Sequence, residues 1–563
     1  MENKVISLNR AIQENIAPGM SIYIGLEAGA ATRELARTFW GRQAGFTIIM
    51  NMIGGHYALS MIHGNLVKKL IFATCADIFP KPSPNPVIQR AFRQGTVKLE
   101  NWSMLSLIQS LQAGALNLPY ATTRSIIGSS LAEENHHSFK LCNNPFDNSE
   151  HIGLIKALNP DISIIHGWAA DYRGNVIMAA PPRDAWGAKA SRNGIIVTVE
   201  RIVSEDFIRE HSMLVKIQGS IVKAVCVAPR GAHPQNLNAQ SLPEFDGYDL
   251  DRKFLAEFRK ASENAQAFEK WVQEWVLDVG SHDEYLKKLE DLGSKATSAA
   301  VRKQSPFEGH SGDGQPPTPD EYAIICGARE IRDLVIKNRY STMFAGIGLS
   351  GLAGWCGYYL LREQGYEIDL IAGGIGYQPC PGDPLLISPA IIATAKMISD
   401  SFDVHGVSAG GVNSHCLGVL GAGQLDKAGN INSTIIKDPT KGDIYLSGAG
   451  GGNDIASVVK EVVIVAVQRA NRLVEQVSYV TCPGTKVSTL VTHEGVFVKH
   501  NSELVLKSYY PSLLSSQEER VKEISQTCGW KLKTMPALEK LALPTTQELN
   551  LVRALDPERI FLK

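Results

Sequence analysis

The sequence concentrates glycine in a turn where backbone amides could do chemistry. Residues 447–454 read SGAGGGND, with Gly448 followed by three glycines at 450–452. Glycine costs conformational entropy, so such a run is typical of a place where the backbone approaches another group closely. We expect a helix over 455–467, which would put these amides at a helix N-terminus, where they could bind an anion or an oxyanion. The alternative is a tight strand-to-helix connection without a ligand.

A second glycine pattern has the spacing of a dinucleotide-binding turn. Gly346, Gly348 and Gly351 form G-x-G-x-x-G after an apolar strand, and Asp369 follows at about the distance of a ribose-binding acid. In that fold the acid ends the second strand, whereas Asp369 precedes the apolar run at 370–371. A nicotinamide-dependent oxidoreductase is therefore an alternative and not the main hypothesis.

Two carboxylates and one arginine lie where they could act on a substrate. Glu27 belongs to a glycine loop, GLEAG, and Glu100 precedes an amphipathic helix that we expect over 102–113. Either carboxylate could serve as a general base, although a helix dipole also favours a glutamate at the helix start. Arg124, close to Ser129, could bind a carboxylate or a phosphate, or form a surface ion pair.

Several other kinds of site are excluded by their missing motifs. The glycine turn lacks the lysine of a phosphate-binding P-loop, and the sequence has no H-E-x-x-H. His136 and His137 are adjacent, a spacing that does not direct both rings to one helical metal site. The nine cysteines include no C-x-x-C pair. We therefore expect no metal and no disulfide scaffold, and a reducing cytoplasm.

Length and composition indicate a large globular protein. The chain has 563 residues, which suggests two to four domains, and its hydrophobic and charged fractions, 44% and 20%, are ordinary for a soluble protein. A net charge of −1 gives no basic field for nucleic acid or membranes. The N-terminal residues have no apolar core of a signal peptide, and no apolar run is long enough to cross a membrane.

One break divides the sequence. Residues 294–319 are rich in Ser, Gly and Pro and predict a linker. Its end carries a helix start, with Thr318 as N-cap, Pro319 at the first helical position and Glu321 three residues after the cap. Before the linker, aromatic residues at helical spacing over 251–293 predict helices whose rings pack in the core.

The two sides of the linker share an order of parts. Each begins with a short strand, a glycine loop and a helix, and each later has an apolar strand ending in D-x-x-G-N, at 171–175 and 426–430. Aspartate and asparagine side chains cap turns, and glycine supplies the positive φ. The fold expected is therefore α/β, with two similar, open and mainly parallel α/β domains in tandem.

These motifs resemble those of the family I CoA-transferases, closest to the glutaconate CoA-transferase branch. Residues 1–293 are similar to its A subunit through GLEAGAATRELA, ENWSMLSLIQSLQAGALNLPYATTRSIIGSSL and ALNPDISIIHGWAADYRGNV. Residues 320–563 are similar to its B subunit through LGVLGAGQLDKAGNINST, SGAGGGNDIAS and LVTHEGVF. The resemblance implies a fused A–B chain with a CoA-thioester site where the two domains meet. It also implies a homodimer or higher homo-oligomer, since family transferases pack their subunits as pairs of pairs.

The chain departs from the family at one decisive position. Family transferases carry a glutamate that attacks the acyl-CoA and forms covalent intermediates. The corresponding stretch here is DLIAGGIG at 369–376, with Ala372 at the glutamate's place. Glu367 lies five residues earlier, and Glu494 falls in a segment that is not catalytic in the family. This resemblance implies that CoA transfer by the family mechanism is lost.

Two relatives with this scaffold also lack the glutamate. One is a ring-opening hydrolase that cleaves a carbon–carbon bond in a cyclic 3-oxoacyl-CoA with an A-subunit glutamate as base, and Glu100 is the nearest counterpart. The other is a decarboxylase with a cysteine at the missing position, but Cys380 here lies eight residues past Ala372. Both reactions require stabilisation of a negative charge beside a thioester, which glycine-loop amides can provide.

We therefore predict an acyl-CoA-processing enzyme that catalyses hydrolytic carbon–carbon cleavage or, second, decarboxylation. Glu100 is the predicted base and Glu27 its competitor, coenzyme A enters only as the substrate thioester, and no nucleic acid or membrane partner is expected. The alternatives are an authentic CoA-transferase, a nicotinamide oxidoreductase and a non-catalytic acyl-CoA sensor. The residues predicted to bind substrate or CoA are Gly25, Gly29, Arg124, Ser129, Gly346, Gly348, Ala372, Gly373, Gly374, Gln424, Gly448, Gly450, Gly451, Gly452 and Asn453.

Overall fold

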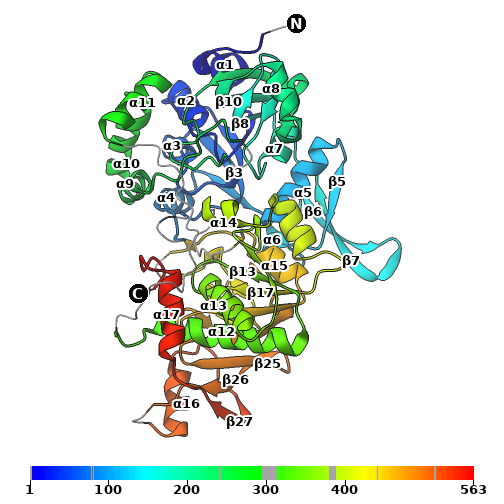
Figure 1. The fold of residues 1–563 in the computed structure, drawn as a ribbon, viewed down its shortest axis with the longest axis vertical. Helices are drawn as coiled ribbons and strands as arrows, with labels where there is room; N and C mark the ends of the chain where they lie inside the picture. The colour runs from blue at the N-terminus through cyan, green and yellow to red at the C-terminus, as the bar shows by residue number, and fades with distance from the viewer. Residues whose placement is uncertain are drawn as a thin grey trace. The chain divides into compact units, whose positions relative to one another are not determined.

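A computed structural model describes residues 3–77, 79, 82–239, 242–293, 314–379, 389–440, 442–512 and 515–562 (Figure 1). Most of the predicted linker, 294–313, and Cys380 lie outside the described residues. The chain divides into two compact units. The first takes 1–123, 134–300 and 440–450, and the second takes 124–133, 301–439 and 451–563. The predicted domain bounds, 1–293 and 320–563, are bounds in sequence and stay a prediction.

The first unit is built on a mainly parallel sheet. Strands β4, β3, β2, β1, β8, β10 and β12 lie side by side in that order, all parallel, and the short strands β9 and β11 add an antiparallel edge beside β8. Their bounds are β1 Ser21–Ile24, β2 Phe46–Met52, β3 Val67–Thr74, β4 Lys98–Asn101, β8 Ile162–Ala170, β9 Val176–Ile177, β10 Ile195–Ile202, β11 Val215–Ile217 and β12 Val222–Val227. Every residue of β8 is buried, as expected for a central parallel strand.

Helices and a small antiparallel sheet complete this unit. The helices are α1 Leu8–Asn15, α2 Gly29–Phe39, α3 Ala58–His63, α4 Pro86–Gln94, α5 Met104–Ala115, α7 Ala185–Lys189, α8 Glu205–Glu210, α9 Arg252–Ser262, α10 Ala265–Val272 and α11 His282–Asp291. The small sheet consists of β5 Tyr120–Thr123, β6 Phe139–Asn144 and β7 Asp147–Lys156, and a short strand β21 spans Ile444–Tyr445. The aromatic residues at 251–293 pack against one another in the core, which confirms their predicted role.

The second unit repeats the parallel core and extends it with antiparallel strands. Strands β14, β13, β17, β22 and β24 are parallel neighbours. Antiparallel strands β15 and then β16 continue beyond β14, and β25, β26 and β27 continue beyond β24. Their bounds are β13 Thr342–Ala345, β14 Asp369–Ala372, β15 Gly376–Tyr377, β16 Met397–Ile398, β17 Cys416–Leu420, β22 Glu461–Val465, β24 Val487–Val491, β25 Gly495–His500, β26 Glu503–Tyr509 and β27 Thr534–Lys540. Shorter strands are β18 Gln424–Asp426, β19 Ile431–Asn432, β20 Ile435–Ile436 and β23 Leu473–Val474.

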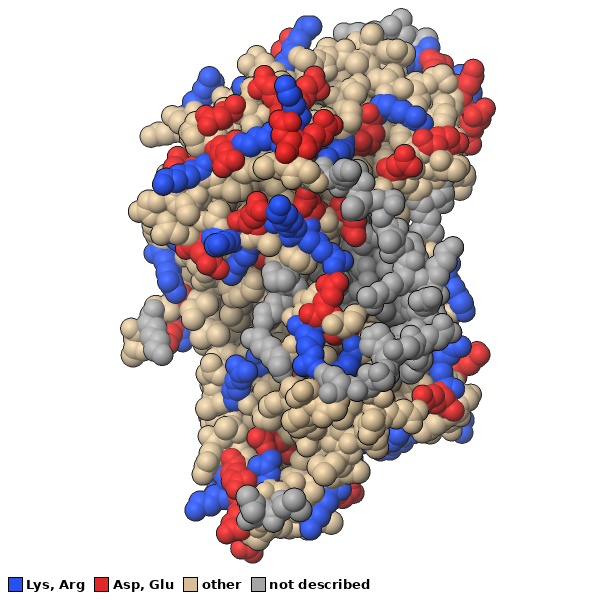
Figure 2. All heavy atoms as spheres, turned by 60° about the vertical axis from the view of Figure 1, so that its left-hand side comes forward, with Lys and Arg blue, Asp and Glu red and all other residues tan. Residues whose placement is uncertain are grey.

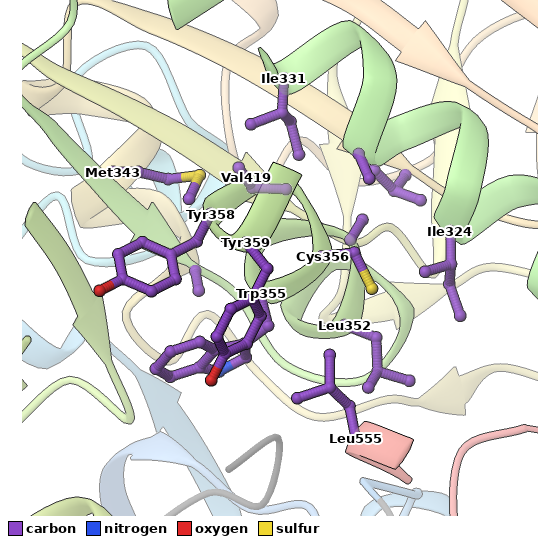
Figure 3. Close-up of a cluster of buried hydrophobic side chains, with 14 of the residues drawn as sticks. Ile324, Ile331, Met343, Leu352, Trp355, Cys356, Tyr358, Tyr359, Val419 and Leu555 are labelled. Carbon is purple, nitrogen blue, oxygen red and sulfur yellow. The ribbon is translucent and has the colours of Figure 1, made fainter. Parts of the chain in front are cut away.

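Helices on the second sheet enclose its main apolar core. Ile324 and Ile331 of one helix, Leu352 and Trp355 of the next, and Leu555 near the C-terminus point into one cluster of buried side chains (Figure 3). The helices are α6 Ser130–Glu134, α12 Pro319–Asn338, α13 Leu349–Glu363, α14 Pro389–Thr394, α15 Gly452–Val458, α16 Gln517–Gln526 and α17 Thr546–Leu555, and a π-helical segment η4 spans Phe402–Ser408. The predicted start of α12 is confirmed, because Thr318 and Glu321 form a capping box with Pro319 behind the cap.

The two sheets share a topology, which confirms the predicted fold of two similar α/β domains. The five strands β2, β1, β8, β10 and β12 of the first unit correspond in order and direction to β14, β13, β17, β22 and β24 of the second. In both units the second of these five strands, β1 or β13, leads into a glycine loop and a helix. Because ligands bind beyond the carboxyl ends of parallel strands, these loops are where a site is expected.

The D-x-x-G-N turn forms the same clasp in each unit. Asp426 Oδ1 accepts hydrogen bonds from the amides of Ala428 and Asn430, and Asn430 Oδ1 accepts one from Gly484 N at 2.8 Å. In the first unit Asp171 accepts from the amides of Arg173 and Asn175, whose own Oδ1 accepts from Gly219 N at 2.9 Å. Each clasp thus ties the turn to the segment that precedes the next parallel strand, β24 or β12.

Two predicted helices have different bounds in the structure. The helix expected over 455–467 is wrong in its second half: α15 ends at Val458, and Glu461–Val465 form strand β22. The sequence EVVIV is rich in β-branched residues, which favour a buried strand over a helix. The helix expected over 102–113 is α5, which begins after Ser103, because that serine accepts a hydrogen bond from Ser106 N as the N-cap.

The close packing of the clasp predicts that adding one methyl group at Gly429 lowers the stability of the protein. Gly429 has a φ of +84°, and a Cβ there would lie 3.0 Å from Val487 Cβ, so Gly429→Ala adds a steric clash to the backbone strain of about 1–2 kcal/mol. Gly365→Ala is the matched control, because Gly365 has a φ of +77° but nothing within 4 Å of its Cβ position. We expect Gly429→Ala to lower the melting temperature clearly more than Gly365→Ala; equal shifts would contradict this account.

Candidate functional site

The glycine loop after β1 is built against neighbouring backbone and a buried aspartate. A Cβ at Gly29 would lie 2.5 Å from the carbonyl oxygen of His233, and one at Gly25 would lie 2.8 Å from Asp184 Oδ2. Both positions therefore require glycine for packing within the first unit. This close approach positions the residue between them, Glu27, at the carboxyl end of the parallel strand.

Glu27 belongs to a buried group of acidic, basic and phenolic side chains. Its carboxylate forms an ion pair with Arg183. The neighbouring Asp184 accepts hydrogen bonds from the Tyr23 hydroxyl at 2.6 Å and from Leu26 N at 3.0 Å. The loop amide and the phenol thus fix Asp184 beside Glu27.

Burial and proximity divide the charge between these two carboxyl groups. Burial raises the pKa of Asp184 to about 8, and the adjacent Glu27 charge adds to that rise. Burial also acts to raise the pKa of Glu27, but the Arg183 charge and hydrogen bonds from Asp184 and Arg183 outweigh it and lower that pKa. At neutral pH the pair therefore holds one negative charge, on Glu27, and Asp184 retains its proton.

Three buried polar atoms around this group have no hydrogen-bond partner among the described residues. They are Asn51 Oδ1, His56 Nε2 and Arg183 Nε. Asn51 also donates to the Tyr23 hydroxyl, and the His56 pKa is lowered to about 4 by burial, against the opposing charge of Glu27. Because His56 Nδ1 accepts from Ala58 N, its Nε2 carries the proton of the neutral ring.

Glu100 is also held by a cation. It lies on β4, with its carboxylate 2.7 Å from Lys69 Nζ and 3.5 Å from His137 Nε2, and it accepts a hydrogen bond from Trp102 Nε1 at 3.1 Å. Burial acts to raise its pKa, but the hydrogen bonds from Lys69 and Trp102 and the Lys69 charge outweigh that and lower it. Glu100 is therefore a buried carboxylate that stays ionised at neutral pH.

The first part of the glycine-rich turn 447–454 is bound within the first unit. Gly450 N donates to Ala73 O, and Ala449 N donates to Asn101 Oδ1, each at 2.9 Å. A Cβ at Gly448, whose φ is +83°, would lie 2.9 Å from Ala73 O. The amide of Gly450, which was expected to face a substrate, is thus already used, and the predicted anion site reduces to the amides of Gly451, Gly452 and Asn453.

The dinucleotide-like turn in the second unit has a packing explanation. A Cβ at Gly346 would lie 2.5 Å from Val419 O, and one at Gly351 would lie 2.6 Å from Gly346 O, so these glycines permit a tight strand-to-helix connection. Gly348, with a φ of +71°, is the N-cap of α13. Asp369 is the first residue of β14, as its sequence position predicts. The acid therefore sits at the opposite end of the strand from a ribose-binding acid.

Ala372 ends β14 beside a second glycine turn. Its side chain is buried, and the next two residues, Gly373 and Gly374, have φ of +61° and +66°. A Cβ at Gly374 would lie 3.2 Å from His405 Cε1, and one at Gly451 would lie 2.4 Å from His405 Nε2. Two predicted site glycines from distant parts of the sequence therefore both pack against the imidazole of His405.

Four predicted binding residues of the second unit form hydrogen bonds within that unit. Asn453 Oδ1 accepts from Ile126 N at 2.8 Å, and its Nδ2 donates to Thr481 O at 2.7 Å. Ser129 donates to Ile126 O, and Gln424 bonds Asn432 and the Asn471 carbonyl. Arg124 is exposed and donates to Gly410 O. These contacts fix residues 124–133 in the second unit, and a role in substrate binding stays a prediction.

The structure adds residues that the motifs did not reveal. Asp184 and Arg183 lie more than 150 positions from Glu27, and His405 lies 46 positions from Gly451, so no local pattern links them. The dipeptide Arg183-Asp184 after two prolines was the available signal for the first pair. His405 had none, because its segment reads as an ordinary mixture of apolar and polar residues.

In the described part of the chain, no group of three or more His, Cys, Asp or Glu side chains has the geometry to hold a metal ion. None of its helices combines the length and the apolar character that a membrane span requires. On the face drawn in Figure 2, basic and acidic side chains are interspersed, as the near-zero net charge leads one to expect.

Comparison with known proteins places this arrangement in a family. A family model described as coenzyme A transferase matches residues 5–228. The A subunit of glutaconate CoA-transferase from Acidaminococcus fermentans is 30% identical over 311 residues, which are 51% of this chain and 92% of that relative. The chain belongs to the coenzyme A transferase family.

This coenzyme A transferase family member is similar to both kinds of subunit. The B subunit of 3-oxoadipate CoA-transferase from Pseudomonas knackmussii is 29% identical over 260 residues, 42% of this chain and 92% of that relative. An acyl-CoA transferase from Escherichia coli, solved as a thioester complex with CoA, shares the fold with a TM-score of 0.65 at 16% identity, covering 100% of this chain and 96% of that one. The predicted resemblance is confirmed.

The raised pKa of Asp184 gives this family member a pH-dependent stability. A carboxyl group whose pKa is about 8 when folded and about 4 when unfolded stabilises the fold fully below pH 4 and loses that contribution as pH rises to 8. We therefore expect Asp184→Asn, which cannot ionise, to remove part of the decline in melting temperature between pH 5 and 8. Melting curves of both proteins across that range test this, and parallel profiles would refute it.

Proposed function

We propose that this protein is an acyl-CoA-processing enzyme that acts without the covalent carboxylate intermediate of CoA transfer. Hydrolytic cleavage of a carbon–carbon bond in a 3-oxoacyl-CoA is the first choice, and decarboxylation of an acyl-CoA is the second. As a member of the CoA-transferase family, the chain takes CoA thioesters as its substrate class. A homodimer and a cytoplasmic location accompany this proposal as predictions from the sequence.

The single observation behind the proposal is the residue at the end of β14. Ala372, aligned by its motif with the family's nucleophilic glutamate, presents a buried methyl group, which cannot form an acyl anhydride. Glu367 lies before the first residue of β14 and is exposed. Its use as a nucleophile would require a shift of the strand by five residues.

Without the nucleophilic glutamate, the proposed reactions would depend on stabilisation of an enolate charge and on proton transfer by a base. Amides of Gly451 and Gly452 form hydrogen bonds to no residue that the structure describes, so they support the proposed role of stabilising an enolate oxygen. Glu100 remains the proposed base that activates water, with Glu27 as competitor. Both carboxylates are ionised, as a base must be, although their ion pairs lower their basicity.

Authentic CoA transfer is the alternative to both of these reactions, and the names of the relatives favour it. Both curated relatives described above are CoA-transferases. This candidate requires a displaced carboxylate that becomes covalently bound to CoA. The two candidates therefore differ in whether a second carboxylic acid is needed as acceptor.

The reaction class is tested by the mass of the product. We expect cyclic 3-oxoacyl-CoAs or glutaconyl-type thioesters to yield a product heavier by one water or lighter by carbon dioxide when no acceptor acid is present. Mass spectrometry of the acyl-CoA pool, with and without an added carboxylate, measures this. Movement of CoA onto the acceptor, or a covalent CoA thioester on the protein, would establish transfer instead.

The base is tested by Glu100→Gln with a matched control. We expect this variant to lose about 10²–10⁴-fold in kcat, the usual contribution of a positioned base. Glu200→Gln is the control, because Glu200 is also a largely buried carboxylate of the first unit with a pKa lowered by a hydrogen bond, from His166. An equal loss in both variants would mean that Glu100 acts only through folding, and a larger loss in Glu27→Gln would transfer the role to Glu27.

A further inference from the structure

The small sheet of the first unit leaves one strand without a neighbour on its outer side in the part of the chain that the structure describes. The strand order is β5–β7–β6, so β6 is an edge, and its sequence, FKLCNN, contains no proline that would block pairing (Figure 1). Apolar side chains are open to solvent here, since Leu141 of β6 is 51% exposed and Phe146 in the β6–β7 turn is 97% exposed. An edge of this kind is a template for pairing with another strand.

Hydrogen bonding within the sheet fixes which residues of β6 face outward. The Ser138 carbonyl accepts a hydrogen bond from Lys156 N of β7 at 2.9 Å. Because hydrogen-bonded and non-hydrogen-bonded positions alternate along an antiparallel pair, the next positions that bond β7 are 140 and 142. The amide and carbonyl groups of Phe139, Leu141 and Asn143 therefore point away from β7.

The residues on either side limit how another strand can pair with this edge. The Phe139 amide is already used, because it donates to the Asn135 carbonyl at 2.8 Å. Pro145, which follows the strand, has no amide hydrogen. Along the described edge, Leu141 and Asn143 are thus the two residues that can offer both an amide and a carbonyl.

We propose that β6 pairs antiparallel with β6 of a second copy of this chain, about a two-fold axis beside Cys142. With the axis there, Leu141 exchanges two hydrogen bonds with Asn143 of the partner subunit, and the symmetry repeats the pair. A shift of the axis by one residue would oppose Asn143 to Phe139, or Leu141 to Pro145, and leave a carbonyl without a donor. The two sheets would join into one of six strands. This inference concerns assembly and is independent of the reaction proposed above.

Charge complementarity favours a second copy as the occupant of this edge. The axis places Lys140 opposite Asn144 of the partner subunit. In each copy the Asn144 side chain donates to Glu150 at 3.4 Å, and Asp147 is its neighbour on β7. Lys140, Asp147 and Glu150 are exposed and form no ion pair with another residue that the structure describes. The axis therefore brings one lysine toward two carboxylates at two equivalent places. On the other face, the two Leu141 side chains become diagonal neighbours.

Asn143→Pro tests the pairing. Because the Asn143 amide points away from β7, proline there removes the hydrogen bond between copies and leaves the bonds within the hairpin in place. We expect this variant to sediment at half the mass of the wild type at micromolar concentration, with a similar melting temperature. Asn143→Ala keeps the amide and is the matched control, which should sediment like the wild type. Equal masses for Asn143→Pro and the wild type would overturn the proposal.

Exchange of charges is a second test that leaves the backbone unchanged. Lys140→Glu should weaken association about tenfold, because it brings carboxylates of the two copies together, and Glu150→Lys should weaken it similarly. The double variant should restore most of the association, since each place again holds opposite charges. Association that responds to neither single change, or that the double variant fails to restore, would contradict the proposed axis.

Cys142 reports the position of the axis. A residue on the axis opposes itself, and in a pair without mutual hydrogen bonds the Cα atoms are about 4.5 Å apart, which a disulfide can span. Oxidation in air with copper–phenanthroline should therefore link two chains. Cys142→Ser should abolish the link, whereas Cys528→Ser, which removes the other half-buried cysteine of the described residues, should keep it. A dimer that is not linked through Cys142 would refute the pairing of β6 with itself.

Discussion

Close approach of backbone atoms at the carboxyl ends of parallel strands is the constraint on which this structure depends. Gly29 lies against the His233 carbonyl, Gly448 against Ala73, and Gly346 against Val419, each at a separation that leaves no room for a Cβ. These contacts hold the loops of each unit tightly over the sheet. Because the loops cannot relax outward, the side chains between the glycines are placed by the backbone and not by their own rotamer preferences.

The tight packing determines how the buried carboxyl groups of the first unit are paired or protonated. Carboxyl groups that are brought below the loops lose their water, and each is therefore compensated, Glu27 by Arg183 and Glu100 by Lys69. Asp184 has no cation of its own and retains a proton instead. In the second unit the imidazole of His405 lies against Gly374 and Gly451, and burial lowers its pKa. The two halves thus share a fold while differing in the electrostatics of their loops.

Sequence patterns predicted the elements whose causes are local. The D-x-x-G-N turns and the capping box at Thr318 are formed by residues within five positions of one another, and both appear as expected. The helix expected over 455–467 was wrong because part of its apolar run, Glu461–Val465, forms the buried strand β22. Pairing with neighbouring strands of the sheet, which the local sequence does not show, determines this structure. Asp184 and His405 were missed because their partners are distant in sequence. For the same reason the sequence could not reveal that the Gly450 amide is bound to Ala73.

Each compact unit is made of three separate segments of the chain, whereas two domains joined by one linker would need only one segment each. Residues 124–133 belong to the second unit although they lie within the first half of the sequence, and residues 440–450 belong to the first although they lie within the second half. A fragment that ends at residue 293 would therefore carry a piece of the other fold and lack a piece of its own. The halves are complementary fragments, which would have to be co-expressed to restore each other, and cleavage of the connecting segment would not release two self-sufficient domains.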